Sequence, residues 1–393
     1  MNASPPTTVW FCNRWAGFQG GAEQHIYDVA LGLRDQGIRC ELLYNTAGQQ
    51  FATFTQAFAS SHRIDFTNIA TWPTVFPLAP THVYYHNWPL QHLHPALPRT
   101  IQTWYMVHDS SLFCPRSHMY HAWSGKTCTQ PLSSDCSIQC RWLSHPLYWT
   151  SPKLLRQRLK NLHTVDQVVC GSSYLANMLQ SLGIPESKLL TIPLARSIAT
   201  PAEIVPKTNK AVPEIVFVGS IIRSKGIDLL LQALTHVEAT FVCRIVGQGK
   251  QIDRFRKLAR KLGFGRGERQ HQTIVFEGWK SQEELRQLYQ NASLVVVPSR
   301  TPETFGLVGL EAMSSGLPVV AFDVGGISEW LQHQHNGFLI PSQDCHKMGH
   351  SIEQLLLNPE LAQRMGQNGL TSLQANFTFP SYIQRLSQAL ALQ

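Results

Sequence analysis

The chain has 393 residues, of which 43% are hydrophobic and 15% charged, and its formal net charge is +8 at pH 7. This length and composition exclude a disordered chain and favour two α/β domains, each with its own apolar core. The positive charge favours an anionic ligand or an anionic membrane surface. Nucleic acid is the weakest candidate, because there is no dense Lys/Arg block, zinc-finger spacing or RNP-like aromatic motif.

The N-terminus gives no sign of export. Residues 1–15 contain paired prolines and no basic region ahead of a long apolar run, unlike a secretory signal. No window approaches the ~20 uninterrupted apolar residues that a transmembrane helix needs. We therefore expect a cytoplasmic protein.

Short apolar runs alternate with amphipathic stretches along most of the chain, a pattern typical of parallel sheets with crossover helices. In the first half we expect strands at 8–13, 39–44, 82–86, 101–108 and 167–170, and helices at 22–36 and 173–182. In the second half we expect strands at 215–219, 241–246, 273–276, 293–297 and 318–322, and helices at 227–236, 251–262 and 282–290.

The alternation breaks once, in a stretch rich in Pro, Thr and Lys that is typical of a linker. We expect this linker at 196–213, between an N-terminal domain at 1–195 and a C-terminal domain at 214–377. A last helix at 378–393 is expected to return to the N-terminal domain. The predicted fold class is α/β, with two Rossmann-like domains whose parallel sheets face a central cleft, where such sheets bind their ligands.

The richest motif follows the strand at 293–297 and opens a helix expected at 305–315. The first N–H groups of a helix lack intrahelical acceptors, so together with the helix dipole they favour a bound phosphate. Here those groups belong to Phe305, Gly306, Leu307 and Val308. Glu303 and Glu311 bracket this turn, and their carboxylates suit the hydroxyls of a sugar or a ribose. Alternatively, Glu303 could be a solvated residue of a loop and Glu311 a residue on the surface of the helix. The apolar neighbours of Glu311 favour a partly buried position.

A second loop, Val218–Gly226, follows the first strand after the linker. Arg223 and Lys225 in this loop could converge on a diphosphate, or they could be solvated loop charges. Gly247 follows the next strand and is a further candidate for donor binding. The run from Gly247 to Lys250 does not meet the P-loop pattern.

Two features of the N-terminal half also suggest a site. Gly20 and Gly21 lie between the first strand and the first helix, where glycine lets a ligand approach the backbone, although such a pair often marks only a turn. The G-x-G-x-x-G pattern is not met. His108 ends a strand and could hydrogen-bond a sugar hydroxyl or shuttle a proton, or be a histidine satisfied within a loop.

Together these motifs resemble the group 1 retaining glycosyltransferases of family GT4, which have the GT-B fold. The E-x7-E motif from Glu303 to Glu311, followed by AMSSGLPVVA, carries the resemblance. It extends through Gly325-Gly326-Ile327, Glu329 and Asn336-Gly337.

The resemblance implies a role for each matching residue. Glu303 would contact donor sugar hydroxyls, Glu311 the nucleotide ribose, and the amides between them the diphosphate. Arg223 and Lys225 would neutralise the leaving diphosphate, and His108 would contact the donor sugar. The Gly20-Gly21 loop would lie near the donor phosphates and the acceptor.

No D-x-D sequence occurs in the chain. Enzymes that clamp a diphosphate with a divalent ion commonly use such a carboxylate pair. We therefore expect no metal and no cofactor, with side-chain cations and helix amides in the metal's place. The expected co-substrate is a UDP- or GDP-linked sugar.

The nine cysteines fall into two groups. Buried, reduced thiols are expected for the five scattered ones, Cys12, Cys40, Cys170, Cys243 and Cys345. An insertion in the N-terminal domain at 112–143 holds the other four, Cys114, Cys128, Cys136 and Cys140. Their spacing lacks the C-x2-C knuckle of structural zinc, although metal binding stays open as one alternative. Disulfides are disfavoured in a reducing cytoplasm. The insertion could form part of the acceptor wall.

The stretch 147–163 combines aromatic residues with four cations. It could lie on an anionic membrane surface, or be an amphipathic helix packed on the N-terminal domain.

The sequence thus predicts transfer of a sugar from a nucleoside diphosphate to a glycan or lipid-linked acceptor, without a metal, in the cytoplasm, with peripheral attachment to the inner face of a membrane as one alternative. Retention of anomeric configuration is implied by the family resemblance alone. The rivals are another GT-B chemistry, such as a nucleotide-sugar epimerase or a phosphorylase, a glycosidase that uses Glu303 and Glu311 as its carboxylate pair, and a non-catalytic sugar- or nucleotide-binding scaffold.

Overall fold

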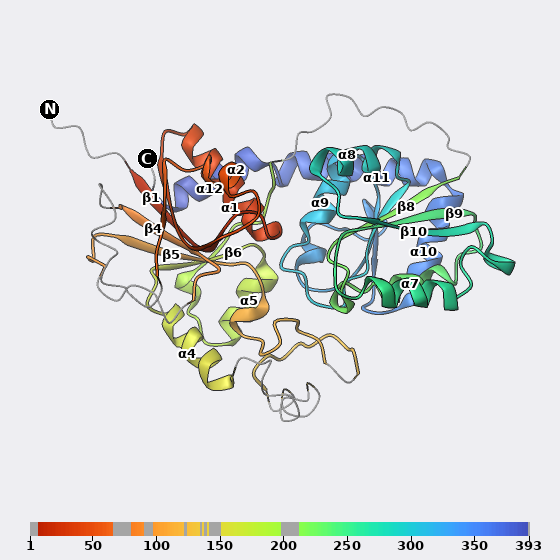
Figure 1. Ribbon diagram of the computed structural model, residues 1–393, viewed down its shortest axis with the longest axis horizontal. Helices are drawn as coiled ribbons and strands as arrows, with labels where there is room; N and C mark the ends of the chain where they lie inside the picture. The colour runs from red at the N-terminus through yellow and green to blue at the C-terminus, as the bar shows by residue number, and fades with distance from the viewer. Residues whose placement is uncertain are drawn as a thin grey trace. The chain divides into compact units, whose positions relative to one another are not determined.

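The computed structural model describes residues 7–65, 80–89, 97–121, 124–133, 136, 140, 151–197 and 212–391. It divides into two compact units, each built on a parallel sheet with helices on its faces (Figure 1). The first unit comprises Met1–Ser117, Leu147–Ser197 and Thr378–Gln393, and the second His118–Pro146 and Ile198–Phe377.

The sheet of the first unit runs in the order β3-β2-β1-β4-β5-β6-β7, and every neighbouring pair of strands is parallel. Its strands are β1 Thr8–Ala16, β2 Arg39–Ala47, β3 Ser60–Arg63, β4 His82–His86, β5 Gln102–Val107, β6 Gln167–Cys170 and β7 Leu189–Thr191. Every residue of β4 is buried, as expected for a strand at the centre of a sheet that is covered on both faces.

Four described α-helices of the first unit lie between its strands in the chain, and a fifth lies near the end of the chain. They are α1 Gly21–Asp35, α2 Phe51–Thr55, α4 Pro152–Leu162, α5 Ser173–Ser181 and α12 Phe379–Ala389. α12 packs against α1, where the side chain of Ile383 fills the space above Gly32 and the hydroxyl of Tyr382 lies 3.1 Å from Nε2 of His25. These contacts hold the end of the chain in the first unit.

The sheet of the second unit runs in the order β10-β9-β8-β11-β12-β13, again parallel throughout. Its strands are β8 Glu214–Val218, β9 Phe241–Val246, β10 Gln272–Gly278, β11 Leu294–Val297, β12 Val319–Phe322 and β13 Gly337–Ile340. Its helices are α6 Ile227–Leu234, α7 Ile252–Lys261, α8 Gln282–Asn291, α9 Leu307–Ser314, α10 Cys345–Leu357 and α11 Pro359–Asn376.

The structure bears on two of the expected boundaries. Most of the expected linker, 198–211, lies outside the described residues. The cysteine-bearing insertion, placed by the sequence in the N-terminal domain, belongs to the second unit from His118 onward. The reason is local, because the hydroxyl of Thr127 donates to the Arg300 carbonyl at 3.0 Å and Gln343 donates to the Gly125 carbonyl at 2.8 Å.

Candidate functional site

The strand order marks the place for a site in the second unit. β8 pairs with β9 on one side and with β11 on the other, so the connections from β8 and from β11 leave in opposite directions. Ligands of doubly wound sheets bind at the carboxyl ends of the strands at such a switch point. The loops there are the Arg223–Lys225 loop after β8 and the 298–306 loop after β11.

The two loops are joined through their backbones. The N–H of Arg300 donates to the carbonyl of Ser224 at 2.9 Å. Arg223–Lys225 forms a 3₁₀ turn that ends at Gly226 with φ of 73°. A Cβ at Gly226 would lie 1.7 Å from the carbonyl oxygen of Pro298, so only glycine lets the turn lie against the end of β11.

Lys225 and Glu303 meet directly across these loops. Nζ of Lys225 lies 2.7 Å from Oε1 of Glu303, and the side chains are 33% and 14% exposed. The hydroxyl of Ser299 donates to the same carboxylate oxygen. Burial alone would raise the pKa of Glu303, but the charge of Lys225 and the two hydrogen bonds outweigh it and the pKa is lowered. Glu303 is therefore an anionic hydrogen-bond acceptor at neutral pH.

Arg223 belongs to a second ionic cluster beside this pair. Nε of Arg223 lies 3.8 Å from Oδ2 of Asp228, and the same oxygen lies 2.7 Å from Nη2 of Arg300. Arg300 is only 4% exposed, whereas the side chain of Arg223 is one third exposed. Arg223 is thus exposed enough to contact a bound anion, whereas the buried Arg300 is held by its close contact with Asp228.

The start of α9 differs slightly from the expected helix. The helix begins at Leu307, and Gly306 caps it in the left-handed region with φ of 85° and no side-chain hydrogen bond. Phe305 lies outside the helix and is fully buried, and its carbonyl accepts from the indole N–H of Trp330. Only the backbone of Phe305 could therefore face a ligand, and the helical amides at this end are those of Leu307 and Val308.

Glu311 is buried inside α9, with 5% of its surface exposed. Its Oε2 accepts a hydrogen bond from the hydroxyl of Tyr289 on α8 at 3.2 Å. The partly buried position expected from its apolar neighbours is confirmed. Tyr289 was not singled out in the sequence, because its place 22 residues before Glu311 gives no pattern.

Gly247 follows β9 and packs against the loop after β8. A Cβ there would lie 1.9 Å from the carbonyl oxygen of Gly219. The glycine thus serves a close backbone contact at the edge of the site, and a role in binding stays a prediction.

In the first unit, the carboxyl ends of β1, β4 and β5 bring together the residues expected there. Nothing among the described atoms lies within 4 Å of a Cβ built on Gly20 or Gly21, so this exposed turn leaves space beside its backbone. Glu23, in the first turn of α1, accepts a hydrogen bond of 3.4 Å from the side chain of Asn87. Burial raises the pKa of Glu23.

His108 adjoins two further histidines that the sequence analysis missed. Its Nε2 lies 3.0 Å from Nδ1 of His86, and its ring meets the ring of His25 edge-on at 5.9 Å. Burial lowers the pKa of His108 to about 4 and that of His25 to about 3, and it lowers the pKa of His86 well below its ordinary value. His86 is the last residue of β4, and His108 directly follows β5. A search of the sequence for histidines at the ends of neighbouring strands would therefore have found His86.

The cysteines of the insertion do not gather into a recognisable metal site. Among the described residues, no group of three or more His, Cys, Asp or Glu side chains is arranged to hold a metal ion. Elsewhere Cys12, Cys40, Cys170 and Cys243 are buried, which raises the pKa of each thiol, and Cys345 is half-buried. Four of the five scattered cysteines are therefore buried as expected.

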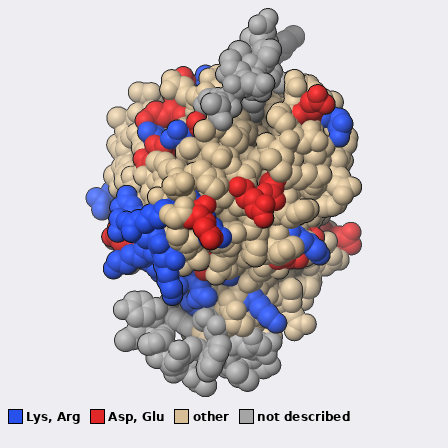
Figure 2. Space-filling view, turned by 90° about the vertical axis from the view of Figure 1, so that its right-hand side faces the viewer, with Lys and Arg blue, Asp and Glu red and all other residues tan. Residues whose placement is uncertain are grey.

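Cations gather on the second unit in a way that the sequence analysis overlooked. Residues 250–269 hold eight Lys and Arg against two Asp and Glu, a net charge of +6. The exposed cations are Lys250, Arg254, Arg256, Lys257, Arg260, Lys261 and Arg266. Figure 2, which looks onto the side where Figure 1 places β9, β10 and α7, shows a dense cluster of Lys and Arg. In the described part of the chain, no helix is both long and apolar enough to cross a membrane.

Solved structures with the same fold include a glycosyltransferase from Rickettsia africae, with a TM-score of 0.71 at 16% identity over 98% of each chain. Anabaena HepE in complex with UDP-glucose has a TM-score of 0.72 at 18% identity, over 98% of this chain and 100% of that one. Sucrose-phosphate synthase from Thermosynechococcus elongatus has a TM-score of 0.72 at 17% identity, over 98% of each chain. These likenesses show the GT-B fold expected from the sequence.

Curated relatives match shorter stretches. An uncharacterised glycosyltransferase of Methanocaldococcus jannaschii is 31% identical over 154 residues, which are 39% of this chain and 41% of that protein. D-inositol 3-phosphate glycosyltransferase of Corynebacterium diphtheriae is 32% identical over 181 residues, 44% of this chain and 40% of that protein. The matches thus span less than half the length of these relatives.

Two family models cover most of the chain in succession. The model described as Glycosyltransferase Family 4 matches residues 19–196, and the model described as Glycosyl transferases group 1 matches residues 202–371. Each match falls largely on one of the two units, and the second contains the Lys225–Glu303 pair. The chain belongs to the group 1, GT4-type glycosyltransferases.

Proposed function

We propose that this protein transfers a sugar from a nucleoside diphosphate sugar to an acceptor, with the donor diphosphate at the carboxyl ends of β8 and β11. The observation that carries the proposal is the 2.7 Å ion pair between Lys225 and Glu303. It places a cation and a hydroxyl acceptor together, three residues before the glycine-capped start of α9. One end of such a site suits phosphate oxygens and the other suits sugar hydroxyls.

The chemical work of the second unit is stabilisation of the leaving group. As the bond between sugar and diphosphate breaks, negative charge develops on the diphosphate. Lys225, Arg223 and the amides of Leu307 and Val308 would meet that charge, and interactions that strengthen in the transition state raise turnover. Glu303 would orient the donor sugar and Glu311 the ribose, as the family resemblance implies.

We propose that this chemistry needs no metal and proceeds with retention of configuration. The absence of a D-x-D sequence and the presence of two partly exposed cations in one loop support the first part. Family membership alone supports retention. UDP and GDP sugars are both candidates, and the UDP-glucose complex of HepE favours testing UDP first.

The first unit is proposed to take the acceptor, with the Gly20-Gly21 turn beside it. His108 would contact the donor sugar as a neutral hydrogen-bonding group, because its pKa of about 4 leaves it uncharged at neutral pH. A glycan or a lipid-linked glycan is the proposed acceptor.

The rival functions are separable. A glycosidase needs one protonated carboxyl as its acid, and the lowered pKa of Glu303 argues against that role. An epimerase would convert donor without acceptor. A binding scaffold would bind nucleotide with no turnover on any donor.

The test is sugar transfer from a panel of UDP and GDP sugars, in the presence of a chelator. Lys225→Ala should lower turnover by ~100-fold or more, by analogy with the loss of one electrostatic donor in an oxyanion hole. Lys280→Ala is the matched control, because Lys280 pairs with Glu284 at 3.2 Å, away from these loops in sequence. Near-normal turnover of Lys225→Ala, or activity that vanishes with the chelator, would contradict the mechanism.

We also propose that the protein acts in the cytoplasm as a peripheral protein at the inner face of a membrane. The cytoplasmic leaflet carries anionic lipids, and each nearby Lys or Arg contributes ~1 kcal/mol to binding. The seven exposed cations at 250–266 support this face of the second unit as the contact.

A further inference from the structure

The cysteine-bearing segment contains a closed turn next to the Arg223 loop. We call the described residues 118–121 and 124–133 the strap. Tyr120 and Thr127 pair as an antiparallel bridge, and the N–H of His121 donates to the Lys126 carbonyl at 2.8 Å. Gly125 lies within this turn with φ of 71°, and its N–H donates to the carbonyl of His121. The described residues on both sides of the turn are therefore held together by backbone hydrogen bonds.

The strap is anchored to the loops after β11 and β13. The hydroxyl of Thr127 donates to the Arg300 carbonyl at 3.0 Å and lies 3.0 Å from the hydroxyl of Ser342. The amide of Gln343 donates to the Gly125 carbonyl at 2.8 Å. The anchoring is polar and directional, so loss of the Thr127 hydroxyl would weaken it without a large change of volume.

The tip of the strap lies against the guanidinium of Arg223. A Cβ on Gly125 would be 3.3 Å from Nη2 of Arg223 and 3.6 Å from Nη1 of Arg300. Asp228 holds both guanidinium groups from another direction. Arg223 is thus confined by the glycine backbone and by a carboxylate, while one third of its side chain stays exposed.

Arg300 links all of these parts. Its backbone N–H donates to Ser224 in the Arg223 loop, its carbonyl accepts from Thr127, and its guanidinium binds Asp228 and the side-chain oxygen of Gln343. A displacement of the strap would therefore reach Arg223 directly at Gly125 and indirectly through Arg300.

We propose that the strap positions Arg223 for the donor diphosphate, with Thr127 and Arg300 as positioning residues. The proposal rests on the placement of the diphosphate at Arg223 in the proposed function. An arginine side chain that is already ordered loses less conformational freedom on binding, so an intact strap raises affinity for the group that Arg223 contacts. The sequence suggested a part in the acceptor wall for this segment, whereas its contacts lie with the donor loops.

Thr127→Val tests the proposal, because valine keeps the shape of threonine and removes the hydroxyl. The measurement is calorimetric affinity for UDP, GDP and the matching monophosphates. In the wild type the diphosphate that fits should bind more tightly than its monophosphate. Loss of one net hydrogen bond should weaken diphosphate binding by about fivefold and leave monophosphate binding unchanged.

Two further variants make the outcome decisive. Ser124→Ala is the control, since its hydroxyl accepts from the N–H of Lys126 within the same turn, and it should bind both ligands like the wild type. Gly125→Ala should reproduce the selective loss, because its Cβ meets Arg223 and its φ is unfavourable for alanine.

Failure of the strap proposal and failure of the proposed function give different results. An unchanged preference for diphosphate in Thr127→Val and Gly125→Ala would overturn the strap alone. An equal loss on both ligands would mark a merely structural role and would also overturn it. A wild type that binds mono- and diphosphates equally would overturn the diphosphate site itself, and the strap proposal with it.

Discussion

His25, His86 and His108 lie side by side in the first unit, and burial keeps all three imidazoles uncharged at neutral pH. Each folded-state pKa lies below the ordinary value of about 6.5. At a pH between the folded-state pKa and the ordinary pKa, the unfolded chain binds protons that the folded chain does not. The stability they contribute is therefore complete above about pH 6.5 and is lost as the pH falls toward the folded-state values.

The free energy of unfolding should accordingly fall as the pH is lowered from 7 to 5. One buried histidine accounts for ~2 kcal/mol over the 1.5 units below pH 6.5. His25→Gln should reduce the pH dependence by about that amount, and urea unfolding at both pH values measures it. The exposed His335→Gln is the control. An unchanged pH dependence in His25→Gln would contradict the account.

The sequence could predict single residues only where a local pattern marks them. Lys225, Glu303 and Glu311 stand in motifs at a turn before a helix, and the structure brings the first two into direct contact. Asp228, Ser299 and Arg300 carry no such mark. The pair of Asp228 and Arg300 joins residues 72 positions apart in the chain, and such a contact has no periodicity to detect. Ser299 lies four residues before Glu303, but a serine at that spacing in a loop forms no motif.

Among the elements, those with long apolar runs were predicted well. The expected strands at 82–86, 167–170 and 241–246 match β4, β6 and β9 to the residue. The strands that were missed, β3, β7 and β13, lie at sheet edges. β3 has the sequence SSHR and β7 has only three residues, so neither has an apolar pattern that would predict a strand. Each forms a strand because it pairs with a longer strand beside it in the sheet.

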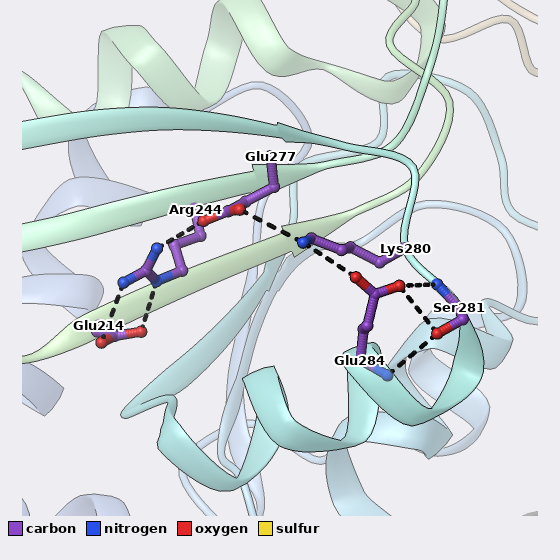
Figure 3. Close-up of polar contacts among 6 residues, drawn as sticks. All are labelled: Glu214, Arg244, Glu277, Lys280, Ser281 and Glu284. Carbon is purple, nitrogen blue, oxygen red and sulfur yellow. Dashed lines mark hydrogen bonds and ion pairs between the residues drawn. The ribbon is translucent and has the colours of Figure 1, made fainter.

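One polar network ties three strands of the second unit together. Arg244 on β9 binds Glu214 on β8 at 2.7 Å and Glu277 on β10 at 2.5 Å, and Lys280 connects Glu277 to the capping box of α8 (Figure 3). The two carboxylates are only 11% and 17% exposed. Without Arg244, Glu214 would lose this cation, and Glu277 would keep the longer contact with Lys280 at 3.9 Å.

Arg244→Met should therefore destabilise the protein by about 1–3 kcal/mol, between the losses typical of surface and of fully buried ion pairs. Arg286→Met is a matched control, because Arg286 makes an exposed pair with Glu283 at 3.5 Å within one helix, and it should change stability by less than about 0.5 kcal/mol. Chemical unfolding measures both. Equal effects of the two substitutions would show that the strand network adds nothing beyond a surface pair.

At the scale of the whole molecule, the positive charge is concentrated in two segments. Residues 250–269 carry a net +6 and residues 151–163 a net +4, so the rest of the chain is net −2 within the total of +8. The first segment is harder to recognise in the sequence, because the cations of α7 alternate with apolar residues that pack inward. Phe255 and Ala259 form that buried side, which leaves the cations on the opposite arc of the helix.

The larger cluster should decide binding to anionic vesicles. We expect the wild-type protein to bind vesicles that contain about one third phosphatidylglycerol and not to bind vesicles of pure phosphatidylcholine. Its affinity for the anionic vesicles should fall as the salt concentration rises. Replacing Arg254, Lys257 and Lys261 on α7 with Gln should weaken binding ~100-fold, since three cations contribute ~1 kcal/mol each. The control makes the same change of net charge on α4, at the exposed Lys153, Arg156 and Lys160, and should retain most of the binding. Equal losses in the two triple variants would mean that only total charge matters, and a selective loss in the α4 variant would place the contact on the first unit instead.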